Sequence, residues 1–473
     1  MAGAPPNDLD VAIIGAGISG AYCAYRLSLA RPDLRIAVFE RSERVGGRLM
    51  SVDVGASTKA ELGGGFVSSL HRNVVGLAKE TQLALTPIRW ERRELFLRGW
   101  YGSDETIAGA AAVYDFAEGE QDKSPYALLA NALAKIAPGY DTLWPMTADA
   151  DPRSALTALE NMTYGGRSLR DWAFRDLLRE VLSADAYELI ANTIGSSANV
   201  GPYSALEMVR TLQFEFASQR AFIVEEGYAE VVQRLLKASG TALRTGCKLS
   251  DLNASPDGVT LHFSDRNARA ARVILALPRA VIAGMAGAER VGQDLAQVAD
   301  VAAFKLFMVF REAWWPAVKT AKAGRGVAGS YTDLPMQQCY LGDTAPGEAA
   351  LCLSVFADAE NAAFWASELT PEQEALRQLR ALHPDIDIPA PEKTLMQMWP
   401  AAWHAWQPGA NSRAVASRLR GGTSDFPVHI CGESFSALQG WAEGAVNSAE
   451  MLMQESFGLD RAAWIDVEYP LDQ

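Results

Sequence analysis

The sequence predicts an α/β fold: a Rossmann-like domain assembled from separate segments, with a second domain of mixed helices and strands inserted into it. Three observations predict it. A strand–glycine turn–helix–strand pattern fills residues 10–40, and two strand-like apolar runs lie far downstream, one stopped by proline at 272–278 and one ending in glycine and acid at 428–433. Long stretches interpreted as helix-rich separate these pieces. The predicted Rossmann-like domain therefore comprises 1–74, 220–284 and 421–473, and the inserted substrate-binding domain comprises 75–219 and 285–420.

The N-terminal pattern predicts a βαβ unit. Residues 10–14 (DVAII) read as a buried strand, and 15–20 (GAGISG) as a glycine turn. Apolar residues near helical spacing then continue to Arg31-Pro32-Asp33, and a second strand, 36–39 (IAVF), ends at Glu40. Downstream, residues 231–236 predict a helix.

Each glycine of the turn has a mechanical reason. Gly15 permits a tight turn after the strand, Gly17 lets a pyrophosphate approach the backbone, and Gly20 lets the helix pack on the sheet. The helix that begins with Ile18 and Ser19 directs unpaired N–H groups and its positive dipole end at the phosphates. Glu40 lies 20 residues after Gly20, where an acid can bind ribose hydroxyls. The pattern predicts dinucleotide binding.

A second glycine pair favours FAD over a nicotinamide cofactor. Arg41 follows the ribose-binding acid, and Val45-Gly46-Gly47-Arg48 comes shortly after it. This segment can form another pyrophosphate clamp, which is useful for a permanently held cofactor and superfluous for one that exchanges.

Composition excludes several classes of function. The 473 residues include 43 Lys plus Arg against 57 Asp plus Glu, and the net charge of −14 argues against binding nucleic acids or anionic membranes. The sequence has no apolar run of about 18 residues and no signal-peptide pattern, so a cytoplasmic protein without a membrane span is expected. The five cysteines are scattered and the five histidines lack metal-ligand spacing, so neither a disulfide framework nor a metal site is expected.

Beyond these local patterns, the chain resembles the FAD-dependent amine oxidase superfamily, which includes monoamine, polyamine and L-amino acid oxidases. The matching pieces, in the family's order, are GAGISG, FERSERVGGR, AELGGGF, VILALP, the Lys305 segment and CGESFSALQGWAEGAVNSAE. The resemblance implies a GR2-type FAD-binding domain with noncovalent FAD, because the family's flavin-linking cysteine has no counterpart around residues 406–411.

The resemblance also implies roles for individual residues. Glu40 would hold the ribose and Arg48 the pyrophosphate. Gly63, Gly64 and Gly65 would pass beneath the flavin ring, Gly432 and Glu433 would lie by the ribityl–pyrophosphate region, and Gly440 and Trp441 would lie beside the isoalloxazine.

Lys305 is the strongest candidate for a catalytic residue. It stands inside the apolar run 302–310 (AAFKLFMVF), where burying a lysine costs several kcal/mol unless it is paired or hydrogen-bonded. The segment resembles the family strand whose lysine contacts flavin N5 through a water, where it would position that water for imine hydrolysis or promote reoxidation by O2. The alternative is a lysine on an edge strand that reaches solvent.

Two signals about the substrate disagree. Residues 357–365 (ADAENAAFW) resemble the bacterial L-amino acid oxidase branch, to which the chain is nearest. That branch places an arginine for the substrate carboxylate where this chain has Phe66, an aromatic residue typical of monoamine oxidases. Another cation would have to replace it, and the candidates are Arg72, Arg89, Arg92 and Arg93.

The sequence therefore predicts an FAD-dependent oxidase that converts an L-amino acid with a sizeable side chain to an imine and then a keto acid, releasing ammonia and hydrogen peroxide. Its expected partners are a small amine or amino acid and O2, with a homodimer left open. The alternatives are a primary amine or polyamine oxidase, an amino acid monooxygenase, and a non-catalytic or maturation flavoprotein.

Overall fold

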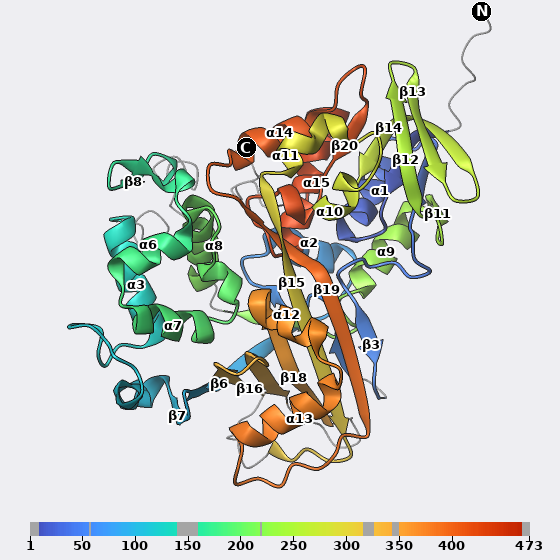
Figure 1. Cartoon of the computed structure of the whole chain (residues 1–473). Helices are drawn as coiled ribbons and strands as arrows, with labels where there is room; N and C mark the ends of the chain where they lie inside the picture. The colour runs from blue at the N-terminus through green and yellow to red at the C-terminus, as the bar shows by residue number, and fades with distance from the viewer. Residues whose placement is uncertain are drawn as a thin grey trace, which may run out of the picture.

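A mostly parallel sheet lies in the upper right of the molecule in Figure 1. The computed structural model describes residues 9–55, 58–139, 159–217, 220–315, 326–342 and 350–465. Strands from distant segments pair in parallel, and two antiparallel strands extend one edge. The strands are β1 (Leu9–Ile14), β2 (Ile36–Phe39), β11 (Ala242–Arg244), β12 (Leu249–Ser255), β13 (Gly258–Phe263), β14 (Asn267–Leu275) and β20 (Val428–Ile430).

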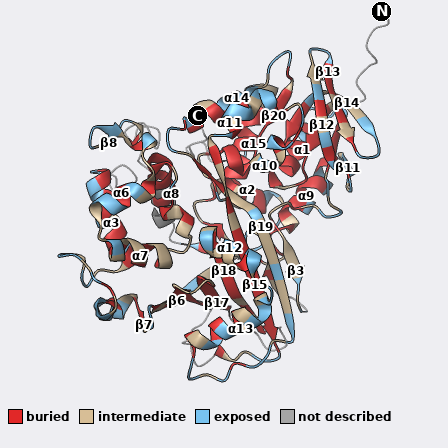
Figure 2. Ribbon diagram, viewed as in Figure 1, coloured by how far each residue is buried: buried red, intermediate tan, exposed pale blue. Residues whose placement is uncertain are grey.

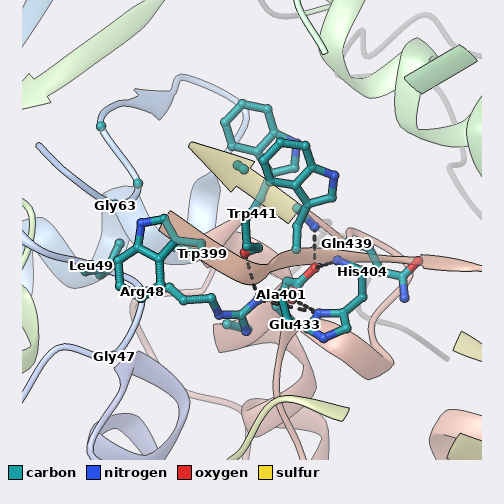
Figure 3. A pocket seen from close by; sticks show the side chains of 18 of the residues that line it. Gly47, Arg48, Leu49, Gly63, Trp399, Ala401, His404, Glu433, Gln439 and Trp441 are labelled. Carbon is teal, nitrogen blue, oxygen red and sulfur yellow. Dashed lines mark hydrogen bonds and ion pairs between the residues drawn. The ribbon is translucent and has the colours of Figure 1, made fainter. Parts of the chain in front are cut away.

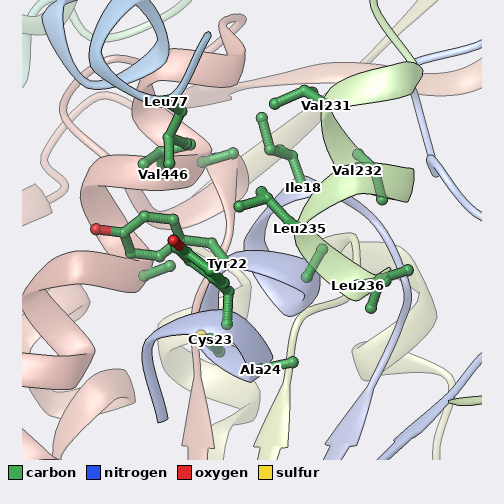
Figure 4. Packing of buried hydrophobic residues seen from close by; sticks show 14 of the residues in the cluster. Ile18, Tyr22, Cys23, Ala24, Leu77, Val231, Val232, Leu235, Leu236 and Val446 are labelled. Atoms are coloured by element: carbon green, nitrogen blue, oxygen red, sulfur yellow. The ribbon is translucent and has the colours of Figure 1, made fainter. Parts of the chain in front are cut away.

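Helices from three segments pack together against this sheet. They are α1 (Ile18–Ala30), α2 (Arg72–Glu80), α9 (Glu230–Ser239) and α15 (Ala442–Phe457). Tyr22, Leu235 and Val446 come from three of them and meet in one buried apolar cluster (Figure 4). α1 ends before Pro32, which has no N–H to continue the helical bonding. This packing anchors the N-terminus of α1 against the sheet.

The second sheet is longer and mostly antiparallel. Its order is β19-β15-β18-β17-β16-β6-β10-β5, with β7 paired to β6. In Figure 1, β15 and β19 run from the first sheet toward the opposite end of the molecule. The bounds are β5 (Val67–Ser68), β6 (Leu85–Leu97), β7 (Trp100–Ser103), β10 (Ala221–Val224), β15 (Val298–Phe310), β16 (Gly326–Thr332), β17 (Gln338–Gly342), β18 (Ala350–Asp358) and β19 (Lys393–Trp406).

Two groups of helices cover this second sheet, and their inward faces are buried (Figure 2). One group, the helical lobe, comprises α3 (Pro125–Ile136), α6 (Phe174–Val181), α7 (Ala184–Thr193) and α8 (Ala205–Ala217). The other comprises α12 (Ala359–Ser367) and α13 (Pro371–Leu382). The remaining helices and strands are α10 (Arg279–Ala283), α11 (Gly292–Leu295), α14 (Ser412–Gly421), β3 (Ser51–Asp53), β4 (Lys59–Glu61), β8 (Thr163–Tyr164) and β9 (Arg167–Ser168). Short 3₁₀ helices span Asp104–Ala112, Leu169–Asp171, Ser197–Val200, Glu289–Val291 and Glu433–Phe435.

The stretch 285–420 is not helix-rich, contrary to the expectation. It holds β15 and β19, of 13 and 14 residues, as well as β16, β17 and β18. Both long strands contain several alanines, methionines or leucines, which favour helix in isolation. Pairing on both sides of β15 decides the outcome, because strand preference depends mainly on the neighbours that a residue packs against.

Gly15 adopts a backbone conformation that other residues avoid. Its φ is +104°, and a Cβ there would lie 2.5 Å from the carbonyl oxygen of Ala276. We expect Gly15→Ala to lower the free energy of unfolding by at least about 2 kcal/mol, because strain and a backbone clash add. Gly240→Ala is the control, since its φ is +62° and nothing lies within 4 Å of the added carbon. Chemical denaturation of both variants checks this, and equal losses would contradict it.

Candidate active site

A cavity of about 1140 Å³ begins at the carboxyl ends of the parallel strands and continues between the second sheet and the helical lobe. At its first end it is lined by residues that directly follow β1, β2 and β14, namely Gly15, Glu40 and Ala276. Ligands of open α/β sheets bind in the crevice outside these strand ends. The cavity therefore joins a dinucleotide-type crevice to a second chamber.

Two glycine loops contact each other at the crevice. Gly17 pairs with Gly46, and the Gly46 N–H donates to the carbonyl of Ala16 at 2.9 Å. A Cβ on Gly47 would lie 3.1 Å from the Gly17 Cα, so the two loops approach closely because both lack side chains. The N-terminus of α1 lies here, with Ile18 among the lining residues. Backbone N–H groups at such a position favour an anion.

Glu40 is held by the loops around it. Its Oε2 accepts the Ala16 N–H at 3.0 Å, and its Oε1 accepts the N–H and the hydroxyl of Ser42, both at 2.9 Å. These bonds fix the carboxylate at the wall of the crevice, and the neighbouring Arg41 also lines it.

A buried ionic cluster stands farther along the cavity (Figure 3). Glu433 accepts from Arg48 Nη1 at 2.6 Å and from the Gly440 N–H at 2.6 Å, and its Oε2 lies 2.7 Å from His404 Nδ1. Burial alone would raise the pKa of Glu433, but the charges of His404 and Arg48 outweigh it and lower that pKa to about 2. Asp300 completes the cluster, 3.2 Å from His404 Nε2. Glu433 is therefore an anion at any physiological pH.

Arg48 keeps donors for a ligand. Its Nη1 donates to Glu433 at 2.6 Å and to the carbonyl of Ala402 at 3.0 Å. Nε and Nη2 hydrogen-bond to no residue in the described part of the chain, and Arg48 lines the cavity. A guanidinium carries five N–H groups, so a fork remains that suits a phosphate or a carboxylate.

Lys305 lies inside the second sheet, with β15 paired to β18 on one side and β19 on the other. This position rules out the edge-strand alternative. Its Nζ donates to the carbonyls of Gly63 at 2.6 Å and Glu61 at 3.2 Å, and a Cβ on Gly65 would lie 3.6 Å from it. Desolvation lowers the pKa of Lys305 to about 8, although the charge of Glu61 opposes that shift. An amine that titrates near neutrality is suited to acid–base work.

Aromatic side chains form a wall beside this lysine. The Phe66 ring meets Trp441 edge-on at 5.4 Å and Trp90 at 6.3 Å, and Trp90 lies 5.9 Å from Tyr340. Behind Trp441, the His71 ring is 4.7 Å away. Burial lowers the pKa of His71 to about 3, so that ring is neutral. The chamber therefore offers an apolar, ring-lined surface to a substrate.

The cavity brings together nearly all the residues singled out from the sequence. They are Gly15, Gly17, Ile18, Ser19, Glu40, Arg41, Gly47, Arg48, Gly63, Gly64, Gly65, Phe66, Lys305, Gly432, Glu433, Gly440 and Trp441. Gly20 is not a lining residue, because its Cα faces the Gly15 carbonyl, where a Cβ would lie 1.9 Å from the oxygen. That contact sets the packing of α1 against the first strand.

Sequence reasoning missed other lining residues. The sequence indicates no role for His404, yet this residue lines the cavity and contacts Glu433. Trp90 and Tyr340 lie on strands whose pairing no local pattern revealed. Of the candidate clamp arginines, Arg93 lines the cavity and Arg72 and Arg89 do not; the side chain of Arg92 is outside those described.

A crevice at the carboxyl ends of parallel strands that opens into a ring-lined chamber with a buried lysine is an arrangement suited to a cofactor-dependent oxidoreductase. The family model for flavin containing amine oxidoreductases matches residues 18–451. The chain therefore belongs to this family and is an FAD-dependent amine oxidase. The resemblance seen in its motifs is thereby confirmed.

Three relatives align with almost the whole chain. Aplysianin-A of Aplysia kurodai is 26% identical, covering 95% of this chain and 90% of its own length. Achacin of Lissachatina fulica is 23% identical, covering 95% of this chain and 93% of its own length. The uncharacterized protein R188 of Acanthamoeba polyphaga mimivirus is 21% identical, covering 96% of this chain and 94% of its own length. A putative flavin-containing monoamine oxidase of Mycobacterium tuberculosis is 34% identical over only 22% of each chain.

Two negative findings concern the described residues alone. Within them, no three His, Cys, Asp or Glu side chains gather as a metal site would require. No helix in the described part of the chain is both long and apolar enough to cross a membrane.

The described residues fit a flavin dinucleotide. The closely packed glycine loops and the N-terminus of α1 line the crevice, and Arg48, which has a free fork, lines the same cavity. Glu40 supplies a fixed carboxylate one strand away. This set of one acid, one arginine and a helix N-terminus matches a ribose followed by a pyrophosphate.

Proposed function

We propose that this chain binds FAD noncovalently in a GR2-type domain formed by 1–74, 220–284 and 421–473. The remaining segments, 75–219 and 285–420, would build the substrate domain. Glu40 would hold the ribose, and Arg48 the pyrophosphate. The Gly63–Gly65 segment, Gly440 and Trp441 would lie at the flavin ring, and Gly432 and Glu433 would lie by the ribityl–pyrophosphate region. The continuity of the cavity from Glu40 to Lys305 supports this placement.

When bound, FAD supplies the oxidation of the carbon–nitrogen bond and the reduction of O2 to hydrogen peroxide. The protein's part is to orient the amine, exclude bulk water and hold charge. Phe66 and Trp441, whose rings contact each other edge-on, would form one wall of the chamber against which the amine-bearing carbon is positioned. Lys305, anchored on two carbonyls, would hold a water for imine hydrolysis and present positive charge to reduced oxygen.

The substrate that we propose is an L-amino acid with a sizeable side chain, which yields a keto acid, ammonia and peroxide. The observation that carries this is the chamber beyond Phe66, which is lined by the rings of Trp90, Tyr331 and Tyr340 and by Arg93, whose side chain is 15% exposed. A peroxide-coupled screen of the twenty L-amino acids and their decarboxylated counterparts tests it. Activity on the decarboxylated compounds alone would overturn the assignment.

A primary amine or polyamine oxidase is the second candidate, favoured by Phe66 at the position where an arginine would mark an amino acid oxidase. The same screen separates the two. A monooxygenase is excluded if peroxide forms in a one-to-one ratio with the substrate consumed, and a non-catalytic flavoprotein is excluded by any turnover.

The lowered pKa of Lys305 gives a pH prediction. The ammonium form dominates below pH 8 and is lost above it, since burial lowers that pKa to about 8 from 10.5. If the charge promotes oxygen reduction, the rate of flavin reoxidation falls between about pH 7 and 9. Stopped-flow reoxidation of the reduced enzyme measures this rate. A Lys305→Met variant should show a flat profile, and an unchanged slope in that variant would contradict the assignment.

A further inference from the structure

We propose that Arg93 binds a carboxylate of the substrate and so makes this oxidase selective for amines that carry an acid group. This inference rests on the proposed function, and it names a residue on β6 rather than the position that Phe66 occupies. The chemistry recognised is a carboxylate, whether it is next to the reacting carbon or at the far end of the side chain.

Arg93 is presented to the chamber by an aromatic cage. Its guanidinium lies 4.7 Å from the Tyr126 ring on α3 and 4.4 Å from the Tyr331 ring on β16. The side chain is 15% exposed and lines the cavity. Rings on two different elements fix the plane of the guanidinium and shield it from water, and both effects strengthen its attraction for an anion.

The existing partners of Arg93 leave donors over. Asp104 pairs with Nε at 3.1 Å and accepts from Nη2 at 3.5 Å, and Nη1 donates to the Tyr126 hydroxyl at 2.6 Å. Of the five guanidinium N–H groups, one on each terminal nitrogen remains. Two such donors can serve the two oxygens of a carboxylate. Asp104 thus orients the Arg93 guanidinium and leaves one N–H group on each terminal nitrogen available to a ligand.

The cage is continuous with the reacting end of the chamber. Tyr331 meets Tyr340 at 6.1 Å, and Tyr340 leads through Trp90 to Phe66 and Trp441 by successive ring contacts. A substrate whose amine lies at Trp441 would therefore run along an apolar wall toward Arg93. This arrangement selects an amine that has an apolar body and an acid group.

The other cationic residues of the cavity are less suited to this role. Arg41, Arg44, Arg48 and Lys248 line the cavity with the glycine loops and the strand ends, and Lys305 already donates to two carbonyls. Arg220 lines the chamber but is exposed to solvent. Arg93 is the cation in this set that rings cover on two sides.

The test compares substrates matched except for the carboxylate. The holoenzyme is assayed with L-norleucine, 6-aminohexanoate and pentylamine, and with L-phenylalanine and phenethylamine. Wild type will prefer one of the carboxylate-bearing substrates, and Arg93→Met should lower kcat/KM for that substrate by about 100-fold. The same variant should change kcat/KM for the matching plain amine by less than about threefold. Arg93→Lys should fall between, because it keeps the charge without the fork. The preferred acid identifies the carboxylate as α or distal.

Binding gives a second readout that does not depend on turnover. The dissociation constant of 3-phenylpropanoate, an acid that lacks an amine, is measured from its effect on the flavin spectrum. It should rise about 100-fold in Arg93→Met and stay unchanged in Arg89→Met, a variant of an exposed arginine on the same strand that does not line the cavity. Thermal unfolding confirms that each variant is folded.

The outcomes separate the two proposals. If wild type oxidises amino acids but Arg93→Met affects acids and plain amines alike, Arg93 is structural and this inference fails while the function stands. If wild type oxidises only plain amines and does not bind 3-phenylpropanoate, the amino acid function fails and this inference fails with it. Plain-amine oxidation with Arg93-dependent 3-phenylpropanoate binding would refute the amino acid function alone.

Discussion

Replacing Lys305 with methionine is expected to leave FAD bound and to slow turnover by about 10²–10⁴-fold. Methionine has a similar shape, so the wall of the chamber is kept, but the charge and the donors to the carbonyls of Gly63 and Glu61 are lost. Stability should change little, because removing a buried ammonium offsets the loss of two hydrogen bonds. The variant should therefore be yellow, folded and slow.

Single-turnover measurements show which step of the reaction, flavin reduction or flavin reoxidation, is slowed. Reduction by substrate without oxygen and reoxidation by O2 are followed separately in the Lys305 variant. Lys393→Met is the control, since Lys393 is exposed on the neighbouring strand β19. Rates in the Lys305 variant within about twofold of wild type for both steps would remove Lys305 from the chemistry.

The second large effect is expected at Arg48. Arg48→Met should weaken FAD binding by about 10²–10³-fold, which corresponds to roughly 3–4 kcal/mol. The substitution removes a pyrophosphate donor and also leaves the buried carboxylate of Glu433 without its 2.6 Å ion pair. Equilibrium titration of apoprotein with FAD, followed by quenching of flavin fluorescence, measures the loss.

Two further variants sharpen this result. Arg48→Lys should recover part of the affinity, since it restores the charge but not the planar fork. Arg35→Met removes an exposed ion pair with Asp10 and should leave the affinity unchanged. An Arg48→Met protein that retains FAD with wild-type affinity would show that Arg48 serves only to neutralise Glu433.

The residues that meet at the strand-end crevice could be predicted from the sequence because they are close together along the chain. Gly15, Gly17 and Glu40 fall within one βαβ unit, where spacing alone sets their geometry. Lys305 was recognisable for a different reason: a charge inside an apolar strand is costly and needs an explanation. Its burial and its two carbonyl partners supply that explanation.

The substrate end was much less predictable, since it is built by pairing between distant strands. Trp90 and Arg93 lie on β6, and Tyr331 and Tyr340 lie on the paired strands β16 and β17. Nothing local marks these residues as neighbours, so Arg93 could not be chosen over Arg89. His404 likewise reaches Glu433 only because β19 passes the segment that follows β20. Long-range register, rather than composition, decided each case.

The central claim is that FAD bound in the crevice faces an amine held in the ring-lined chamber. Anaerobic mixing of the purified holoenzyme with the L-amino acids and their amine counterparts tests it most directly, with the flavin absorption band as the signal. We predict that an amino acid with a sizeable side chain bleaches the band and that air restores it with release of peroxide. A protein that takes up no FAD, or whose bound flavin no amine reduces, would contradict the claim.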